Sequence, residues 1–229
     1  MIFLIKIAIM TVLKITDLNS SEFEFSLEIY KSSFPPNETR PVEKVVEMLQ
    51  NDKNYELFSC LKDNSVVGIS LLYTFRSLGI GLLDYMSVLP SYQGQGLGKE
   101  IFEATLKNFL SNVPSGAGIL IEVQREDAPN LQQIEISTRK NRIMFYMKMG
   151  SRILEGVSYF LPPIHHNNDP EKMYLLIKPL KDFYYLPRDS ITQYLEAIYS
   201  TVYQYKGKEL FDKMCQELPD KILLKNWKL

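Results

Sequence analysis

The sequence has very few of the residues that build metal centres and disulfide frameworks. Its 229 residues include two cysteines and two histidines. Cys60 and Cys215 lie far apart and show neither CxxC nor the mixed Cys/His spacing of a zinc site. We therefore expect no metal ion, and cysteines used in this way predict a reducing, cytoplasmic setting.

An excess of charge of one sign is also missing. The 26 Lys and Arg residues nearly balance the 27 Asp and Glu residues, which gives a formal net charge of -1. Proteins that bind the nucleic-acid backbone need a basic surface that releases counterions from the phosphates. The balance predicts that nucleic acid is not a partner.

Long apolar runs are scarce as well. The apolar stretch at residues 1–13 is interrupted by Lys6 and falls short of the roughly 20 residues that cross a bilayer. It shows neither the positive leader nor the small-residue cleavage site of a signal peptide, so we expect no membrane association. Two interpretations stay open: the chain starts at Met10, with residues 1–9 an upstream extension of the reading frame, or residues 3–9 form an additional edge strand.

What the sequence does contain is typical of a folded domain, with 45% hydrophobic and 23% charged residues. β-Branched and aromatic stretches predict strands at residues 11–16, 55–61, 65–75, 81–89, 118–123, 153–161 and 173–177. Apolar residues at helical spacing predict helices at about residues 21–34, 42–49, 98–110 and 137–148. Two more amphipathic stripes, at residues 191–202 and 210–218, predict helices that pack on this domain or on a partner subunit.

The most informative segment is a glycine-rich turn between a predicted strand and a predicted helix. Three glycines stand at alternate positions, Gly94, Gly96 and Gly98, directly before the helix. The free amides and the positive dipole end of a helix bind anions, and glycine lets a phosphate approach the backbone closely. A P-loop is excluded because position 93 is glutamine, and GxGxG is not the GxGxxG of a dinucleotide fold.

This segment resembles the pyrophosphate loop of the GNAT superfamily of N-acetyltransferases. The family pattern (Gln/Arg)-x-x-Gly-x-(Gly/Ala) is met by Gln93, Gly96 and Gly98, and residues 145–150 (FYMKMG) are similar to the family's Phe-Tyr-x-x-x-Gly helix end. The resemblance implies an α/β (α+β) fold with a central mixed, mostly antiparallel, splayed sheet flanked by helices. It covers a domain at residues 11–180, and residues 181–229 form a C-terminal helical extension.

The resemblance also implies that acetyl-CoA is the acyl donor. In this family the pantetheine arm lies along the strand before the glycine loop and the diphosphate lies on the loop. The positions implied for donor binding are Met86, Ser87, Val88, Gln93, Gly94, Gln95, Gly96, Leu97, Gly98 and Lys99. Arg139 and Arg142 stand where the family often has Asn and a small residue, so they either contact coenzyme A phosphates or face solvent.

Three residues are candidates for the chemistry. Tyr146 matches the family tyrosine that donates a hydrogen bond or a proton to the coenzyme A sulfur. An amine with a pKa near 10.4 must lose a proton before it attacks a thioester, and Asp84 and Glu122 are the two candidate bases. Each carboxylate is otherwise a structural hydrogen-bonding group. His165 and His166 lie in a loop, where such residues are more often inert.

The acceptor is a small-molecule amine or an amino group of a protein or peptide, and the resemblance does not name it. In the family, the first two helices and the late strand loops select the acceptor, which here indicates Phe34, Glu38, Arg40 and Tyr159. The function implied is direct acetyl transfer to a primary amine in a ternary complex. The alternatives are an acyl-CoA-binding sensor or partner-binding protein without turnover, and an oligomerisation module, such as a homodimer, built on the tail helices.

Overall fold

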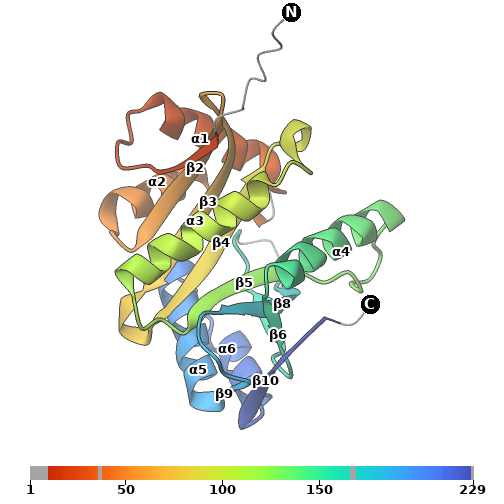
Figure 1. The fold of residues 1–229 in the computed structure, drawn as a ribbon. Coiled ribbons are helices and arrows are strands. Elements are labelled where there is room, and N and C mark those ends of the chain that lie inside the picture. Colours follow the sequence, from red (N-terminus) through yellow and green to blue (C-terminus); the bar gives the residue numbers. More distant parts are fainter. Residues whose placement is uncertain (1–9, 36–37, 166–168, 228–229) are drawn as a thin grey trace, which may run out of the picture. The chain divides into compact units, whose positions relative to one another are not determined.

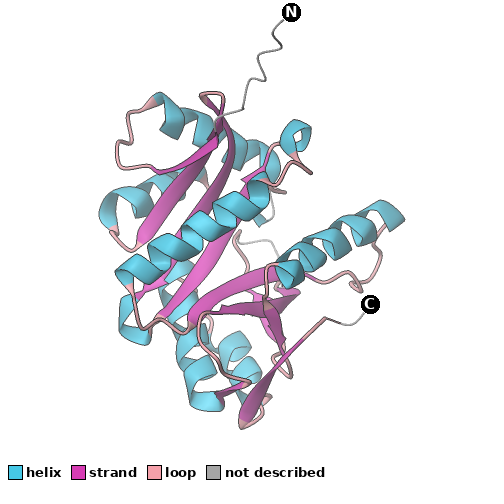
Figure 2. Ribbon diagram, in the orientation of Figure 1, coloured by secondary structure: helices cyan, strands magenta, loops and turns pink. Residues whose placement is uncertain are grey.

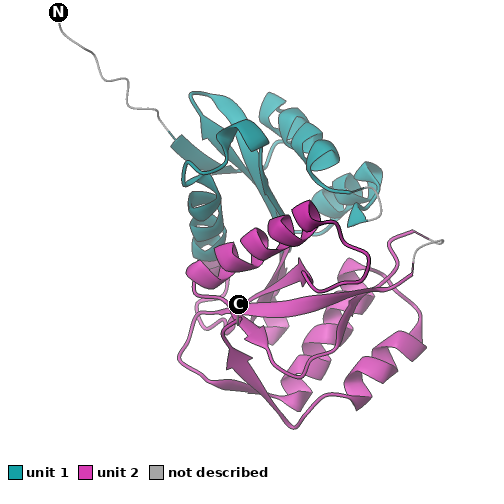
Figure 3. Ribbon diagram, turned by 90° about the vertical axis from the view of Figure 1, so that its right-hand side faces the viewer, with its two compact units in different colours: residues 1–72, 85–108 teal, residues 73–84, 109–229 magenta. Residues whose placement is uncertain are grey.

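The computed structural model describes residues 10–35, 38–165 and 169–227. Within these residues, strands of a mixed sheet and six α-helices follow one another along the chain (Figure 1 and Figure 2). The chain divides into two compact units, which Figure 3 shows in different colours. Unit 1 comprises Met1–Leu72 and Tyr85–Asn108, and unit 2 comprises Tyr73–Asp84 and Phe109–Leu229.

In unit 1 the strand order is β1-β2-β3-β4, and β3 and β4 continue into unit 2. The strands are β1 (Met10–Lys14), β2 (Tyr55–Lys62), β3 (Ser65–Phe75) and β4 (Ile80–Val88), and the helices are α1 (Ser21–Ser33), α2 (Val42–Asn51) and α3 (Leu97–Asn112). The predicted hairpin is present: its turn residues Asp63 and Asn64 have φ values of 49° and 66°, as a two-residue hairpin turn of type I′ requires.

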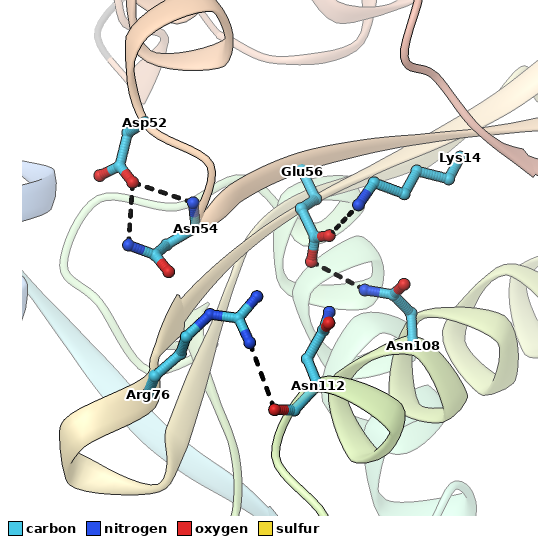
Figure 4. Close-up of polar contacts among 7 residues, drawn as sticks. All are labelled: Lys14, Asp52, Asn54, Glu56, Arg76, Asn108 and Asn112. Carbon is cyan, nitrogen blue, oxygen red and sulfur yellow. Dashed lines mark hydrogen bonds and ion pairs between the residues drawn. The ribbon is translucent and has the colours of Figure 1, made fainter.

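A buried charge in unit 1 is fully engaged by its neighbours. Glu56 on β2 is 4% exposed. Its carboxylate pairs with the Lys14 ammonium and accepts a hydrogen bond from the Asn108 side-chain amide at 2.7 Å (Figure 4). A buried carboxylate without partners would be costly, so these contacts give Glu56 a structural role that ties β1, β2 and α3 together.

In unit 2 the strand order is β4-β5-β8-β6-β10-β9, and β7 also pairs with β8. The pair β4–β5 is parallel, whereas β5–β8, β6–β8, β7–β8, β10–β6 and β10–β9 are antiparallel. The strands are β5 (Gly118–Gln124), β6 (Arg152–Leu154), β7 (Tyr159–Leu161), β8 (Glu171–Pro179), β9 (Tyr185–Pro187) and β10 (Lys221–Lys225). The helices are α4 (Gln133–Lys148), α5 (Arg188–Ala197) and α6 (Lys208–Gln216).

Three predicted elements differ from the structure. The single strand expected at residues 153–161 is two strands, because a turn in which Gly156 has φ 81° separates β6 from β7. Helix α4 begins four residues early, at a capping box in which the side chains of Gln132 and Glu135 each bond the other's backbone amide. The tail forms two short strands in addition to its helices.

The C-terminal segment is built into unit 2. Strand β10 pairs with β6 and with β9, and Ile222 in β10 is fully buried. Apolar residues of α5, among them Ile191 and Leu195, are also fully buried. Unit 2 thus contains residues from both sides of position 180, and the boundary expected there stays a prediction.

Two findings concern the ends of the chain and the membrane. Residues 1–9, on which both interpretations of the N-terminus depend, lie outside the described residues, and Met10 is the first residue of β1. Among the described helices, none combines the length and the apolar character that crossing a bilayer requires.

Candidate active site

The glycine turn in unit 1 has the backbone geometry of an anion cradle. Gly94 and Gly96 have φ values of 74° and 84°, a region that favours glycine. Both are exposed, and a Cβ built on either would meet no described atom within 4 Å. Helix α3 begins at Leu97, so the amide end of the helix lies next to this open space, and the Lys99 and Glu100 amides close its first turn on the Gly96 carbonyl.

Side chains hold the turn in this shape. The Gln93 side-chain amide donates to the Val88 carbonyl at 3.0 Å, and the Gln95 amide donates to the Ser91 carbonyl at 3.3 Å. The Lys62 ammonium donates to the Gln95 side-chain oxygen and lies 5.6 Å from the centre of the Tyr92 ring. Lys62, which ends β2 and was not among the predicted site residues, thus places a cation beside the glycine turn.

The other positions implied for donor binding differ in what their side chains do. Leu97 is buried, and together with Ile101 it packs against Met86 and Val88. These residues can therefore offer the donor their main-chain groups, while their side chains fill the core. Lys99 is exposed in the first turn of α3, 3.8 Å from Glu103.

The structure brings together the predicted acceptor residues of unit 1. Phe34 packs against the ring of Tyr85 with centroids 5.0 Å apart, and the Arg40 guanidinium lies 5.2 Å from the same ring. The Tyr85 hydroxyl donates to the Glu38 carbonyl at 3.0 Å and accepts from the Arg40 amide at 3.3 Å. Tyr85, which the sequence analysis did not select, is thus the centre of this acceptor cluster.

The acceptor cluster and the Met86 side chain lie on opposite faces of β4. Successive side chains of a strand point to opposite faces, so Tyr85 and Met86 diverge. Tyr85 contacts the residues around α1, including Tyr30 at 4.8 Å between ring centroids, whereas Met86 packs on α3. By the same alternation Asp84 belongs to the Met86 face, as predicted.

In unit 2 the structure places Glu122 in a tyrosine cluster. The Tyr159 hydroxyl donates to Glu122 Oε1, and the Tyr203 hydroxyl donates to Oε2 at 2.5 Å. Tyr159 is fully buried, and burial together with the Glu122 charge raises the pKa of its phenol well above the ordinary value. The Tyr159 hydroxyl is thus engaged by Glu122, and the expected contact of Tyr159 with the acceptor stays a prediction.

The two candidate bases lie on neighbouring strands. The parallel register of β4 and β5 pairs Leu82 with Leu120 and Leu83 with Ile121. The pairing ends there, so Asp84 and Glu122 are the residues that directly follow the last paired positions of the two strands. Both residues are partly exposed. The structure does not choose between the two carboxylates.

Tyr146 is 6% exposed on α4. Burial raises the pKa of its phenol to about 12, and the nearby Arg142 charge opposes that rise. A phenol with this pKa stays protonated at neutral pH and remains a hydrogen-bond donor.

The arginines of α4 have protein partners. Arg139 donates to the Arg125 carbonyl at 2.9 Å and lies 3.6 Å from the Glu171 carboxylate, with a side chain that is 13% exposed. Arg142 donates to the Gln124 side-chain oxygen at 2.9 Å and is exposed. Arg139 is therefore not simply a solvated charge, and of the two Arg142 keeps the greater freedom to meet a phosphate.

The two histidines lie between β7 and β8 in the sequence. His165 is exposed, and His166 lies outside the described residues. No group of three His, Cys, Asp or Glu side chains within the described part of the chain is arranged to hold a metal ion.

The comparisons with known proteins agree with this fold. Residues 23–135 match the model of the acetyltransferase (GNAT) family, a segment that holds the glycine turn and Glu122 and ends before Tyr146. The match and the fold confirm the predicted family. The chain carries a domain of the acetyltransferase (GNAT) family, which is a family of acyltransferases.

Solved structures extend the likeness beyond that segment. A Bacteroides thetaiotaomicron protein described as an acetyltransferase from the GNAT family is 22% identical, with a TM-score of 0.68 over 86% of this chain and 99% of that chain. Arabidopsis thaliana NAA60, in complex with acetyl-CoA, is 14% identical, with a TM-score of 0.54 over 75% and 99%. The ribosomal-protein-S18-alanine N-acetyltransferase of Escherichia coli is 16% identical, with a TM-score of 0.50 over 76% and 96%. No curated protein matches the sequence.

Proposed function

We propose that this protein transfers an acetyl group from acetyl-CoA to a primary amine, directly, in a ternary complex. The observation that carries the proposal is the open glycine turn at the start of α3, with Gly94 and Gly96 in the left-handed region and Lys62 beside it. Main-chain amides and a cation are the groups that bind a diphosphate. The fold likeness to a protein bound to acetyl-CoA supports the same donor.

The proposed reaction needs one proton acceptor and one donor to sulfur. The amine loses a proton to Glu122 or Asp84, directly or through water, and its nitrogen then attacks the thioester carbonyl. The oxyanion is stabilised by a backbone amide of Met86 or Ser87. The nitrogen gives up its remaining extra proton to water, the carbon–sulfur bond breaks, and the thiolate leaves and takes a proton from water.

Tyr146 is proposed to stabilise that thiolate by a hydrogen bond. Its phenol has a pKa of about 12, whereas a thiol has a pKa of about 8.5. Complete proton transfer from the phenol to the thiolate is therefore unfavourable. The proposed role of Tyr146 is therefore to donate a hydrogen bond, and the thiolate takes its proton from water.

The acceptor is proposed to meet the acceptor cluster around Tyr85, which combines the Phe34 ring with the Arg40 guanidinium. The Phe34 ring suits an acceptor that carries an apolar part, in a small molecule or at a protein terminus. Arabidopsis Naa50, with a similar fold at a TM-score of 0.52, was solved with a bisubstrate analogue that joins coenzyme A to a peptide. The free thiols of Cys60 and Cys215 support the proposed cytoplasmic setting.

The test compares one glycine of the turn with one exposed residue further along α3. Gly96→Val places a β-branched side chain at φ 84° over the open cradle, so we expect acetyl-CoA affinity to fall by at least about 100-fold in calorimetric titration. Lys107→Val is the matched control, because it introduces the same side chain at an exposed position of α3 away from the turn. Its affinity should stay within about threefold of the wild type.

Turnover is then measured as thiol release from acetyl-CoA over a panel of amines and amino-terminal peptides. Release that depends on the amine supports the enzyme. Tight binding without release over the whole panel favours the acyl-CoA-binding sensor. Unchanged affinity in Gly96→Val refutes the glycine turn as the donor site.

A further inference from the structure

The C-terminal segment supplies a side chain to the candidate base. Glu122 lies on β5, inside the segment that matches the family, whereas Tyr203 follows α5 and lies far outside it. The Tyr203 hydroxyl donates to Glu122 Oε2 at 2.5 Å while the Tyr159 hydroxyl donates to Oε1. Both carboxylate oxygens are thus held by phenols, one of them from the tail.

The tail fixes Tyr203 by several independent contacts. A π-helical turn, Ile198–Val202, follows α5, and the Tyr203 amide closes it by donating to the Ile198 carbonyl at 3.1 Å. Tyr199 lies within this turn and donates its hydroxyl to the Phe160 carbonyl, next to Tyr159. Its ring meets the rings of Tyr159 and Tyr203 edge to face, at 6.3 Å and 6.5 Å. Turns of this kind occur frequently at functional sites.

The groups around Glu122 act on its charge. The two phenols stabilise the carboxylate by hydrogen bonds, and Tyr199 adds a neutral ring. Asp84 follows Leu83, the last residue of β4 that pairs with β5, and is the nearest acidic residue along β4. From β8, Leu175 faces Glu122 in register and offers no charge, while the Arg142 guanidinium of α4 bonds to Gln124, two residues further along β5.

We propose that Tyr203 is a positioning residue for acetyl transfer: its hydrogen bond orients the Glu122 carboxylate and keeps it ionised, ready to take the proton of the amine. The inference rests on the proposed function, because it requires Glu122 to be the base. It assigns the tail a part in the reaction in addition to its part in the fold. It names Glu122 as the base because the Tyr203 hydroxyl from the tail donates to its carboxylate.

The test removes one hydroxyl and follows the proton affinity of Glu122. In Tyr203→Phe the ring remains and the donor is lost, so the Glu122 pKa should rise by about one pH unit. We expect the same rise in two measurements, the carboxyl carbon NMR titration of Glu122 and the acidic limb of the pH profile of kcat/KM. The full-length protein is used, and Glu122→Gln assigns the carboxyl resonance.

Two further variants make the result specific. Tyr205→Phe removes a hydroxyl from a ring that packs 5.8 Å from Tyr199, and it should leave the Glu122 titration and the acidic limb unchanged. Replacing Tyr203 with 3-fluorotyrosine makes the phenol a stronger donor while keeping its shape. It should shift both measurements to lower pH, and it serves as the test if Tyr203→Phe does not fold.

The outcomes separate the inference from the proposed function. If the Glu122 pKa is the same in the wild type, in Tyr203→Phe and in the 3-fluorotyrosine variant, the inference is overturned, while the proposed acetyl transfer is unaffected. If the Glu122 pKa shifts but the acidic limb of the kcat/KM profile does not, Glu122 does not take the proton of the amine, and the inference is also overturned. Absence of thiol release from the wild-type protein over the whole amine panel refutes the proposed function, and the catalytic role of Tyr203 falls with it.

Discussion

The glycine turn and the Glu122 cluster are two different kinds of site. The turn is exposed and contiguous in sequence, and its groups are main-chain amides set by glycine dihedrals. The cluster consists of side chains from β5, β7 and the tail, and its Tyr159 member is fully buried. One site depends on the path of the backbone, and the other depends on the placement of single hydroxyl groups.

The difference assigns separate tasks to the two regions. A main-chain site recognises a diphosphate whatever the neighbouring side chains are, so most substitutions there should leave donor affinity intact. The cluster has no such tolerance, because each carboxylate oxygen of Glu122 accepts from a particular phenol. Substitutions that alter the backbone of the turn should therefore affect donor binding, and changes around the cluster should affect the rate and its pH dependence.

The largest expected effect is on stability. It tests whether the C-terminal segment is part of the hydrophobic core of unit 2, the unit that contains the Glu122 cluster. Ile222→Ala removes a fully buried side chain from β10 and should lower the free energy of unfolding by about 2–5 kcal/mol, measured by urea denaturation. Leu223→Ala, at the next position and 41% exposed, is the control and should change stability by less than about 1 kcal/mol. Equal small losses in the two variants would contradict the integration of the tail.

A smaller effect is expected at Tyr146, measured on the rate. Tyr146→Phe should lower kcat for thiol release by about tenfold, because the thiolate loses one hydrogen bond worth about 1–2 kcal/mol. With a pKa of about 12 the phenol stays protonated from about pH 6 to pH 10, so the loss should be the same across that range. A loss that grows with pH would show that Tyr146 titrates in this range and transfers its proton.

The smallest expected effect concerns the cation beside the glycine turn. Lys62→Ala should weaken acetyl-CoA binding by about threefold at low ionic strength, and the difference should shrink in about 0.5 M salt, because the ammonium is a partly exposed charge. Lys44→Ala, which removes an exposed lysine of α2 paired with Glu47, is the matched control. Equal affinities for Lys62→Ala and the wild type at low salt would remove Lys62 from the donor site.

Much of unit 1 and of the donor site could be predicted because the information is local. The Asp63-Asn64 turn and the glycines at 94 and 96 show their backbone conformations directly in the residue types. The start of α4 was misplaced because Gln132 is an uncommon cap, and the split between β6 and β7 was missed because a single Gly156 interrupts a β-rich stretch.

The residues that were missed are those whose roles come from distant parts of the chain. Lys62 belongs to the donor turn through Gln95, and Tyr85 belongs to the acceptor cluster through Phe34 and Arg40. Tyr203 appeared in the sequence as one more aromatic residue near an amphipathic stripe. Its contact with Glu122 spans 81 positions, and no periodicity reports a contact at that separation.

The sequence by itself determined the family, the order of most strands and helices, and the anion cradle, because glycine dihedrals and hydrophobic periodicity act between near neighbours. The tertiary structure alone decided that Tyr159 and Tyr203 both hold Glu122, that Tyr85 gathers Phe34 and Arg40, and that β10 joins the sheet of unit 2. Those arrangements arise when long loops close and separate segments pack on one another. They are caused by the burial of side chains that lie far apart in the chain. Residue types at neighbouring positions do not encode that burial.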